Sequence, residues 1–131
     1  MIPIVIVDTN VILRFLLAND PKLSPQAKTI FTSAQQGKSK IYIDEVVVAE
    51  SVWALTSYYK FSKPILVEQL TQLLSPNWIV SPKKKLLLKT MHLFANTNLS
   101  YIDCWIASVS QSKHYPLRTF DKDLSKLSAK L

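Results

Sequence analysis

The unbroken apolar run near the start of the chain restricts the possible folds more than any other feature. Residues 2–7, IPIVIV, include five β-branched residues and no polar one. Alternation of apolar and polar residues is typical of a strand with one face in solvent, whereas an unbroken run is typical of a strand covered on both faces. Residues 2–7 therefore predict a buried strand of a parallel sheet.

Strands and helices alternate along the rest of the sequence. Further strands are predicted at 40–43 (KIYI), 78–80 and 116–120 (PLRTF). Helices are predicted at 11–19, from a Ser24 cap and Pro25 to just before Gly37, at 44–59, at 64–74, from Ser81 and Pro82 to Ala95, and from Ser100 to Lys113. This alternation predicts the α/β class, with a central parallel sheet of about four to five strands flanked by helices in one domain over residues 1–131.

The size and composition of the chain exclude several classes of protein. With 131 residues, 48% of them hydrophobic, the chain can bury one core, so the disordered, collagen-like and low-complexity classes are excluded. The single cysteine, Cys104, cannot form an internal disulfide, which predicts a reducing, cytoplasmic compartment. The start MIPIVIVD lacks the basic segment of a secretory signal, and 18 consecutive apolar residues occur nowhere, so we expect no export and no membrane partner.

The charge of the chain favours a polyanionic partner, and the few acids stand out against it. Sixteen Lys and Arg against nine Asp and Glu give a net charge of +7, which attracts phosphates but can equally serve solubility. The run Lys83–Lys85 is expected to be a solvated first turn of a helix. Four acids lie in or beside apolar segments, namely Asp8, Glu50, Asp103 and Asp121. A role in keeping the surface soluble does not explain why these four acids lie among apolar residues.

Two of these acids, Asp8 and Asp121, directly follow predicted strands. Ligand crevices of open α/β sheets form at the carboxyl ends of the strands. Each acid could instead be the N-cap of the helix that follows it, a position that Asp favours. Two acids placed alike at one edge of the sheet favour a site there.

The other two acids, Glu50 and Asp103, lie within predicted helices. The helix at 44–59 is apolar almost all round, so we expect it to be deeply buried, and no Lys or Arg lies one turn from Glu50. A Glu on an apolar face costs several kcal/mol unless a cation meets it. Asp103 follows Ser100 by three residues and could complete a capping box, but its apolar one-turn neighbours place its carboxylate along a buried side of the helix.

Convergence of the four carboxylates would require a metal ion. Two unit charges 4 Å apart repel by about 4 kcal/mol at an effective dielectric constant of 20. Oxygen ligands without His or Cys select hard cations, so Mg²⁺ or Mn²⁺ is the expected cofactor. Such a site activates water and stabilises charge on a phosphoryl group.

Sequence motifs for phosphate binding, zinc binding and serine nucleophiles do not occur in the chain. Gly37-Lys38-Ser39 resembles the end of a phosphate-binding loop, but Thr32 stands where its first Gly would be. The two histidines, His92 and His114, lack zinc-ligand spacing, and no Ser lies in a G-x-S-x-G sequence.

Four segments of the chain resemble, in order, the four motifs of a PIN domain. They are VDTNVILR at 7–14, VVVAESVWAL at 46–55, SYIDCWIAS at 100–108 and RTFDKDL at 118–124. The resemblance covers essentially the whole chain and is closest to the small VapC-type toxins of toxin–antitoxin pairs. It implies a PIN-like nuclease domain, namely a Mg²⁺- or Mn²⁺-dependent endoribonuclease that hydrolyses RNA with metal-activated water.

The resemblance also implies roles for individual residues. Asp8, Glu50 and Asp103 match the metal-binding acids of the family, and Asp121 matches the fourth and least constant acid. Asn10 and Thr119 match polar positions that orient ligands or water, although a helix start and a strand-end hydroxyl explain them equally well. Arg14 and Arg118 are expected to contact RNA phosphates. Trp105 departs from the family pattern, because it is bulkier than the residue usual two positions after the third acid.

The family resemblance implies partners, and three other functions remain open. A VapC-type toxin would bind an antitoxin protein and form a homodimer. One alternative is a non-catalytic PIN-like module that binds RNA. A second is a chain that mainly binds a partner protein, for which Trp53, Trp78, Tyr58 and Tyr59 would supply exposed apolar surface, although core packing explains most such residues. Another is an aspartyl phosphotransferase with Asp8 as nucleophile, which would normally carry an acid where Asn10 stands.

Overall fold

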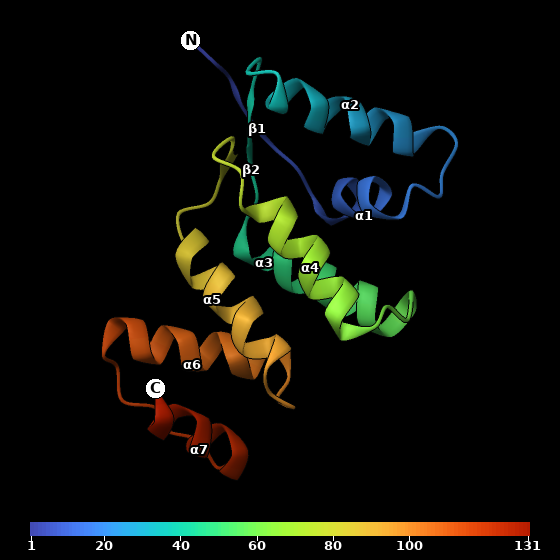
Figure 1. Cartoon of the computed structure of the whole chain (residues 1–131). Coiled ribbons are helices and arrows are strands. Elements are labelled where there is room, and N and C mark those ends of the chain that lie inside the picture. Colours follow the sequence, from blue (N-terminus) through green and yellow to red (C-terminus); the bar gives the residue numbers. More distant parts are fainter. The chain divides into compact units, whose positions relative to one another are not determined.

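The structure, a computed structural model, describes residues 1–131 and shows an α/β protein with three strands and seven α-helices. The chain divides into two compact units, a first unit at Met1–Pro82 and a second unit at Lys83–Leu131. All three strands and the first four α-helices belong to the first unit, and the last three α-helices form the second (Figure 1). None of the helices has the length and apolar character needed to span a bilayer.

The sheet consists of three short parallel strands, β1 (Ile4–Ile6), β2 (Lys40–Tyr42) and β3 (Ile79–Val80), in the order β1-β2-β3. Ile6 pairs with Tyr42, and Ile41 pairs with Ile79. The central strand is the most deeply buried, because Ile41 and the following Ile43 are inaccessible to solvent. The prediction of a parallel sheet is confirmed.

The prediction that residues 2–7 are covered on both faces is wrong. β1 is an edge strand with one neighbour, and the side chains of Ile4 and Ile6 are 57% and 77% exposed, whereas Val7 is buried. Side chains alternate between the faces of a strand, so Ile4 and Ile6 lie on the open face, while Val5 is half-buried and Val7 enters the core. Because both faces of β1 carry apolar side chains, the sequence pattern could not show which face is covered and which is exposed.

The prediction of four to five strands is also wrong, because residues 116–120 form no strand. This segment belongs to the second unit, which contains no strand with which it could pair. A strand needs a partner for its backbone N–H and C=O groups. The β-prone sequence PLRTF is therefore an irregular connection that leads to Asp121, the N-cap of the last helix.

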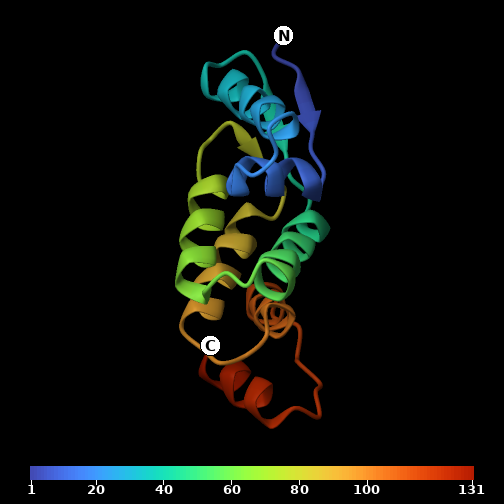
Figure 2. The ribbon, with the colours of Figure 1, turned by 90° about the vertical axis from the view of Figure 1, so that its right-hand side faces the viewer.

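The first unit contains four α-helices and one π-helical turn. They are α1 (Thr9–Leu17), α2 (Leu23–Gln35), α3 (Glu45–Trp53), the π-helical turn η1 (Ala54–Tyr58) and α4 (Lys63–Leu74). Figures 1 and 2 show α1 and α2 side by side, with α2 next to the strands. Ser24 is not the N-cap of α2, because the helix begins at Leu23 and the Ser24 hydroxyl instead donates to the carbonyl of Arg14 at 2.8 Å.

The second unit consists of α5 (Lys84–Ala95), α6 (Tyr101–Lys113) and α7 (Lys122–Lys130). The chain reverses direction between α5 and α6, which pack through an edge-to-face contact of Phe94 and Tyr101 with ring centroids 5.9 Å apart (Figure 1). The predicted Ser100 cap is confirmed, whereas α5 begins two residues after Pro82. α7 packs on α6 and buries Leu124.

Candidate functional site

Asp8 lies at the carboxyl end of β1 and caps α1. Its Oδ1 accepts a hydrogen bond from the Val11 N–H at 3.1 Å, its side chain is exposed, and its Oδ2 has no hydrogen-bond partner. The strand-end and N-cap interpretations are therefore both correct. One carboxylate oxygen orients the side chain, and the other remains available to a ligand.

Asp44 stands in the equivalent position at the end of β2, although its segment-end setting did not mark it as a candidate acid in the sequence. Asp8 and Asp44 each lie two residues beyond the paired Ile6 and Tyr42. Both Asp44 oxygens are engaged, since Oδ1 accepts from the Val46 N–H at 2.9 Å and Oδ2 from the Tyr42 hydroxyl at 3.1 Å. Asp44 thus resembles Asp8 in position and in capping but has no free oxygen.

Glu50 lies on the exposed face of α3, so the prediction of a helix buried all round is wrong for this face. Val46 and Trp53, one turn on either side of Glu50, are 70% and 65% exposed, whereas Val48 and Val52 enter the core. Glu50 forms no hydrogen bond or ion pair. The expected desolvation cost therefore does not arise, and its carboxylate is free to bind a cation.

The second unit holds Asp103 and Asp121, each next to a helix start. The Asp103 N–H donates to the Ser100 Oγ at 3.1 Å, and its half-buried carboxylate has no hydrogen-bond partner. Asp121 is exposed and caps α7, with its Oδ1 accepting from the Leu124 N–H at 2.8 Å. Because no strand precedes it, Asp121 is a helix cap and not a strand-end acid.

The structure divides the candidate acids between the two units, with Asp8 and Glu50 in the first and Asp103 and Asp121 in the second. Neither unit by itself gathers three or more His, Cys, Asp or Glu side chains in a group that could hold a metal ion. All four carboxylates lack an ion pair with Lys or Arg and keep at least one oxygen without a partner. This donor set fits a hard cation such as Mg²⁺, and convergence of the four acids stays a prediction.

The polar residues beside these acids differ in their contacts. Asn10 is exposed in the first turn of α1, and its side chain forms no hydrogen bond. Thr9, which no sequence pattern singled out, is buried with its Oγ1 unpartnered. Thr119 Oγ1 accepts from the Asp121 N–H at 3.0 Å and so shapes the entry to α7. Thr119 thus positions Asp121, and Asn10 is free to act toward a ligand.

The two arginines expected to contact RNA are in different settings. The Arg14 guanidinium is half-buried, with Nη1 donating to Asn19 Oδ1 at 2.9 Å and Nη2 to the Tyr59 hydroxyl at 2.6 Å. Arg118 is exposed, and its Nη1 donates only to the neighbouring Leu117 carbonyl at 3.3 Å. Arg14 therefore links α1 to the segment after η1, whereas Arg118 is open to an anion.

Substituting Tyr59→Phe is expected to lower the free energy of unfolding by about 1–2 kcal/mol, because the charged Arg14 donor loses its acceptor. Urea unfolding followed by circular dichroism measures this change. Tyr58→Phe is the matched control, since the Tyr58 hydroxyl has no partner, and it should change the free energy by less than about 0.5 kcal/mol. Equal effects of both substitutions would contradict the assigned role of the hydrogen bond.

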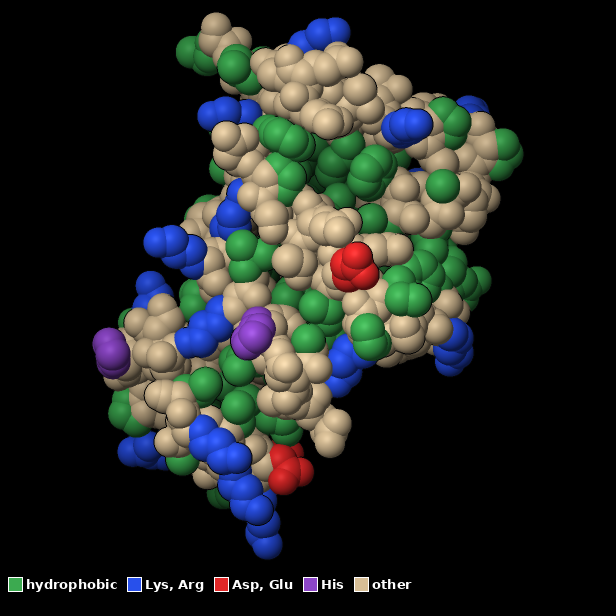
Figure 3. Space-filling view, in the orientation of Figure 1, with side chains coloured by type: hydrophobic (Ala, Val, Ile, Leu, Met, Phe, Trp, Pro, Cys, Tyr) green, Lys and Arg blue, Asp and Glu red, His purple; other side chains and the backbone are tan.

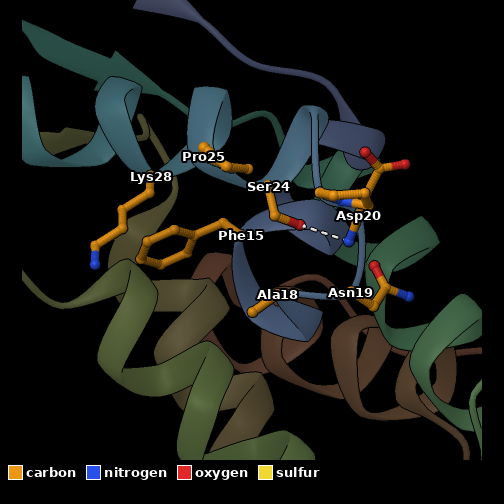
Figure 4. Close-up of a pocket in the computed structure, with 8 residues that line it drawn as sticks. Phe15, Ala18, Asn19, Asp20, Ser24, Pro25 and Lys28 are labelled. Carbon is orange, nitrogen blue, oxygen red and sulfur yellow. Dashed lines mark hydrogen bonds between the residues drawn. The ribbon is translucent and has the colours of Figure 1, made fainter.

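A cavity of about 830 Å³ lies between the end of α1 and the start of α2, apart from the four acids (Figure 4). It is lined by Phe15, Ala18, Asn19, Asp20, Pro21, Ser24, Pro25 and Lys28. The Asp20 carboxylate accepts from the N–H groups of Leu23 and Lys22, which lowers its pKa below the usual 3.8. These bonds fix the turn between the helices, and the cavity brings together no candidate catalytic group.

Basic side chains are spread over the face shown in Figure 3, where acidic ones are few. In the second unit, the Lys83 Nζ lies 5.9 Å from the centroid of the Trp105 ring, a cation–π distance. Burial lowers the pKa of Lys84, whereas Lys83 and Lys85 are exposed. The prediction of a solvated run thus holds for two of the three lysines, and Trp105 packs beside one of them.

Comparison with known proteins gives one result. The family model described as PIN domain matches residues 5–130, a range that includes all four candidate acids and most of both units. Neither the curated proteins nor the solved structures contain a match to the chain.

Proposed function

The chain belongs to the PIN domain family, whose members are generally nucleases, and from this premise we propose that it is a Mg²⁺- or Mn²⁺-dependent endoribonuclease. The match over residues 5–130 is the observation that carries the proposal. The four acids at the family's motif positions and the net charge of +7 support it. Nucleic acid is the substrate class of this fold, and RNA is the more specific proposal.

The residues that would hold the metal are Asp8, Glu50, Asp103 and Asp121. The helix-cap bonds from Val11 N–H and Leu124 N–H orient Asp8 and Asp121 before any ligand arrives, while an oxygen of each stays free. A bound Mg²⁺ supplies positive charge that polarises water and stabilises the phosphoryl oxygens. Asn10 and Thr119 would orient ligands or water beside the first and fourth acids, and the exposed Arg118 would contact phosphate.

We further propose that the chain is a cytoplasmic VapC-type toxin that acts as a homodimer and is held inactive by an antitoxin protein. The order and spacing of its four motifs support this assignment. The exposed apolar side chains of Ile4, Ile6 and Phe120 would offer surface to protein partners.

Incubation of the full chain with an end-labelled RNA in Mg²⁺ or Mn²⁺ tests the proposed activity. Internal cuts that produce fragments of defined length are the expected result. Tight binding without cleavage would instead support the non-catalytic RNA-binding alternative. A trapped aspartyl-phosphate at Asp8 would support the phosphotransferase.

A further inference from the structure

Two aromatic side chains near Glu50 are exposed to an unusual degree. Trp53 is 65% exposed and Tyr58 is 73% exposed, although both belong to a helical segment whose other face forms the core of the first unit. Val46, Glu50 and Trp53 follow one another at intervals of four and three residues, so they share one face of α3. The Trp53 ring thus lies one turn from the carboxylate that is proposed to bind the metal.

The π-helical turn η1 sets the relation between the two aromatic residues. The Tyr59 N–H donates to the Ala54 carbonyl at 3.0 Å, five residues back, and not four as in an α-helix. Trp53 directly precedes this turn and Tyr58 ends it, so the wider turn lies between the two exposed aromatic residues. Single π-helical turns inside helices occur frequently at functional sites.

The ring of Tyr58 is supported from behind without being buried. It meets Tyr59 edge to face, with ring centroids 4.8 Å apart and an interplanar angle of 77°. The Tyr59 hydroxyl accepts a hydrogen bond from Arg14 Nη2, and the Arg14 guanidinium is itself oriented by a second hydrogen bond, from Nη1 to Asn19 Oδ1. A ring that is oriented before binding loses little conformational entropy when a ligand stacks on it.

We propose that Trp53 and Tyr58 form an aromatic platform on which unpaired RNA bases stack beside Glu50. This inference rests on the proposed function, and it assigns to the two residues the positioning of the substrate strand. Every base has a flat π face, so aromatic side chains next to basic residues bind single strands of many sequences. The exposed Lys60 follows the platform directly, and the net charge of +7 favours a polyanionic occupant of this surface.

Binding of fluorescent oligonucleotides to the full chain in EDTA tests the platform without requiring cleavage. The probes are a single-stranded RNA and an abasic strand of the same length and charge. Trp53→Ala and Tyr58→Ala should each lower the affinity for the RNA roughly 5- to 150-fold and leave the affinity for the abasic strand unchanged. Trp53→Phe and Tyr58→Phe should retain most of the affinity, because each keeps an aromatic ring.

Ile65→Ala is the matched control, since Ile65 is a 50% exposed apolar residue of α4 in the same unit. It should bind both probes like the unmodified chain, and circular dichroism checks that every variant is folded. Equal losses for RNA and for the abasic strand would overturn the proposal. So would a change from dimer to monomer in light scattering for Trp53→Ala without loss of base-dependent binding, because Trp53 would then belong to a contact between copies.

The test separates this inference from the proposed function. If the unmodified chain prefers RNA to the abasic strand through Trp53 but cuts no RNA in Mg²⁺ or Mn²⁺, the platform stands and the nuclease assignment fails. If the chain cuts RNA and Trp53→Ala changes neither KM nor binding, the nuclease assignment stands and the platform is wrong.

Discussion

Chelation of divalent metal by EDTA is expected to abolish RNA cleavage, and added Mg²⁺ or Mn²⁺ to restore it. The four candidate ligands are all carboxylates, and without a cation they would repel one another and the RNA phosphates. A metal ion contributes several kcal/mol to the stabilisation of the transition state, so the rate should fall by about a thousandfold or more. Initial rates on an end-labelled RNA measure this loss.

The control for the EDTA experiment is a comparison of different metal ions in restoring cleavage. Because the donor set contains no His or Cys, Mg²⁺ or Mn²⁺ should restore more activity than Zn²⁺ at equal concentration. Circular dichroism should be the same with and without EDTA, since the cores of both units consist of apolar side chains. Cleavage that continues at the full rate in EDTA would exclude the proposed mechanism.

Asp8→Asn is expected to lower kcat/KM for RNA cleavage by about a thousandfold while leaving the fold intact. Asn is as good an N-cap as Asp, so the bond from the Val11 N–H to the side chain persists and only the charge is lost. The loss of a charged ligand weakens metal binding and therefore transition-state stabilisation. Cleavage rates at several Mg²⁺ concentrations, together with thermal unfolding, separate this effect from unfolding.

Asp103→Asn should have the same effect from the second unit. The capping bond of Asp103 runs from its backbone N–H to the Ser100 Oγ and does not involve the carboxylate. The substitution therefore leaves the start of α6 unchanged. Full activity of either variant would rule out its acid as a metal ligand.

Asp44→Asn is the matched control for both variants. Asp44 caps α3 at the end of β2 much as Asp8 caps α1 at the end of β1, but its two oxygens are already occupied by Val46 N–H and the Tyr42 hydroxyl. We expect this variant to keep the cleavage rate of the unmodified chain. An equal loss in Asp44→Asn would show that charge at this edge matters generally and that the motif position of Asp8 does not.

The part of the fold predictable from sequence is the part set by residues close together in the chain. The Ser100 cap, the Asp8 cap and the bounds of α4 and α6 were predicted nearly correctly, because capping and helix formation involve residues within about four positions. The four motifs identified the family for the same reason, since each is a short segment that can be read by itself.

The candidate site was predictable in its residue types but not in its surroundings. Sequence patterns singled out Asp8, Glu50, Asp103 and Asp121, and the structure shows that each has a free carboxylate oxygen. The sequence patterns did not show that Glu50 shares an exposed face of α3 with Trp53. An apolar sequence neighbour indicates burial only when another element covers it.

The sequence alone determined the α/β class, the starts of α4 and α6 and the candidate acids, whereas the tertiary structure decided which apolar residues are covered and which segments pair. Pairing of Ile6 with Tyr42 and of Ile41 with Ile79 joins residues far apart in the chain, and residues 116–120 find no such partner in their unit. Ile4, Ile6 and Trp53 are as apolar as the core residues but remain exposed. Burial and strand pairing depend on which distant segments meet, and local sequence patterns do not contain that information.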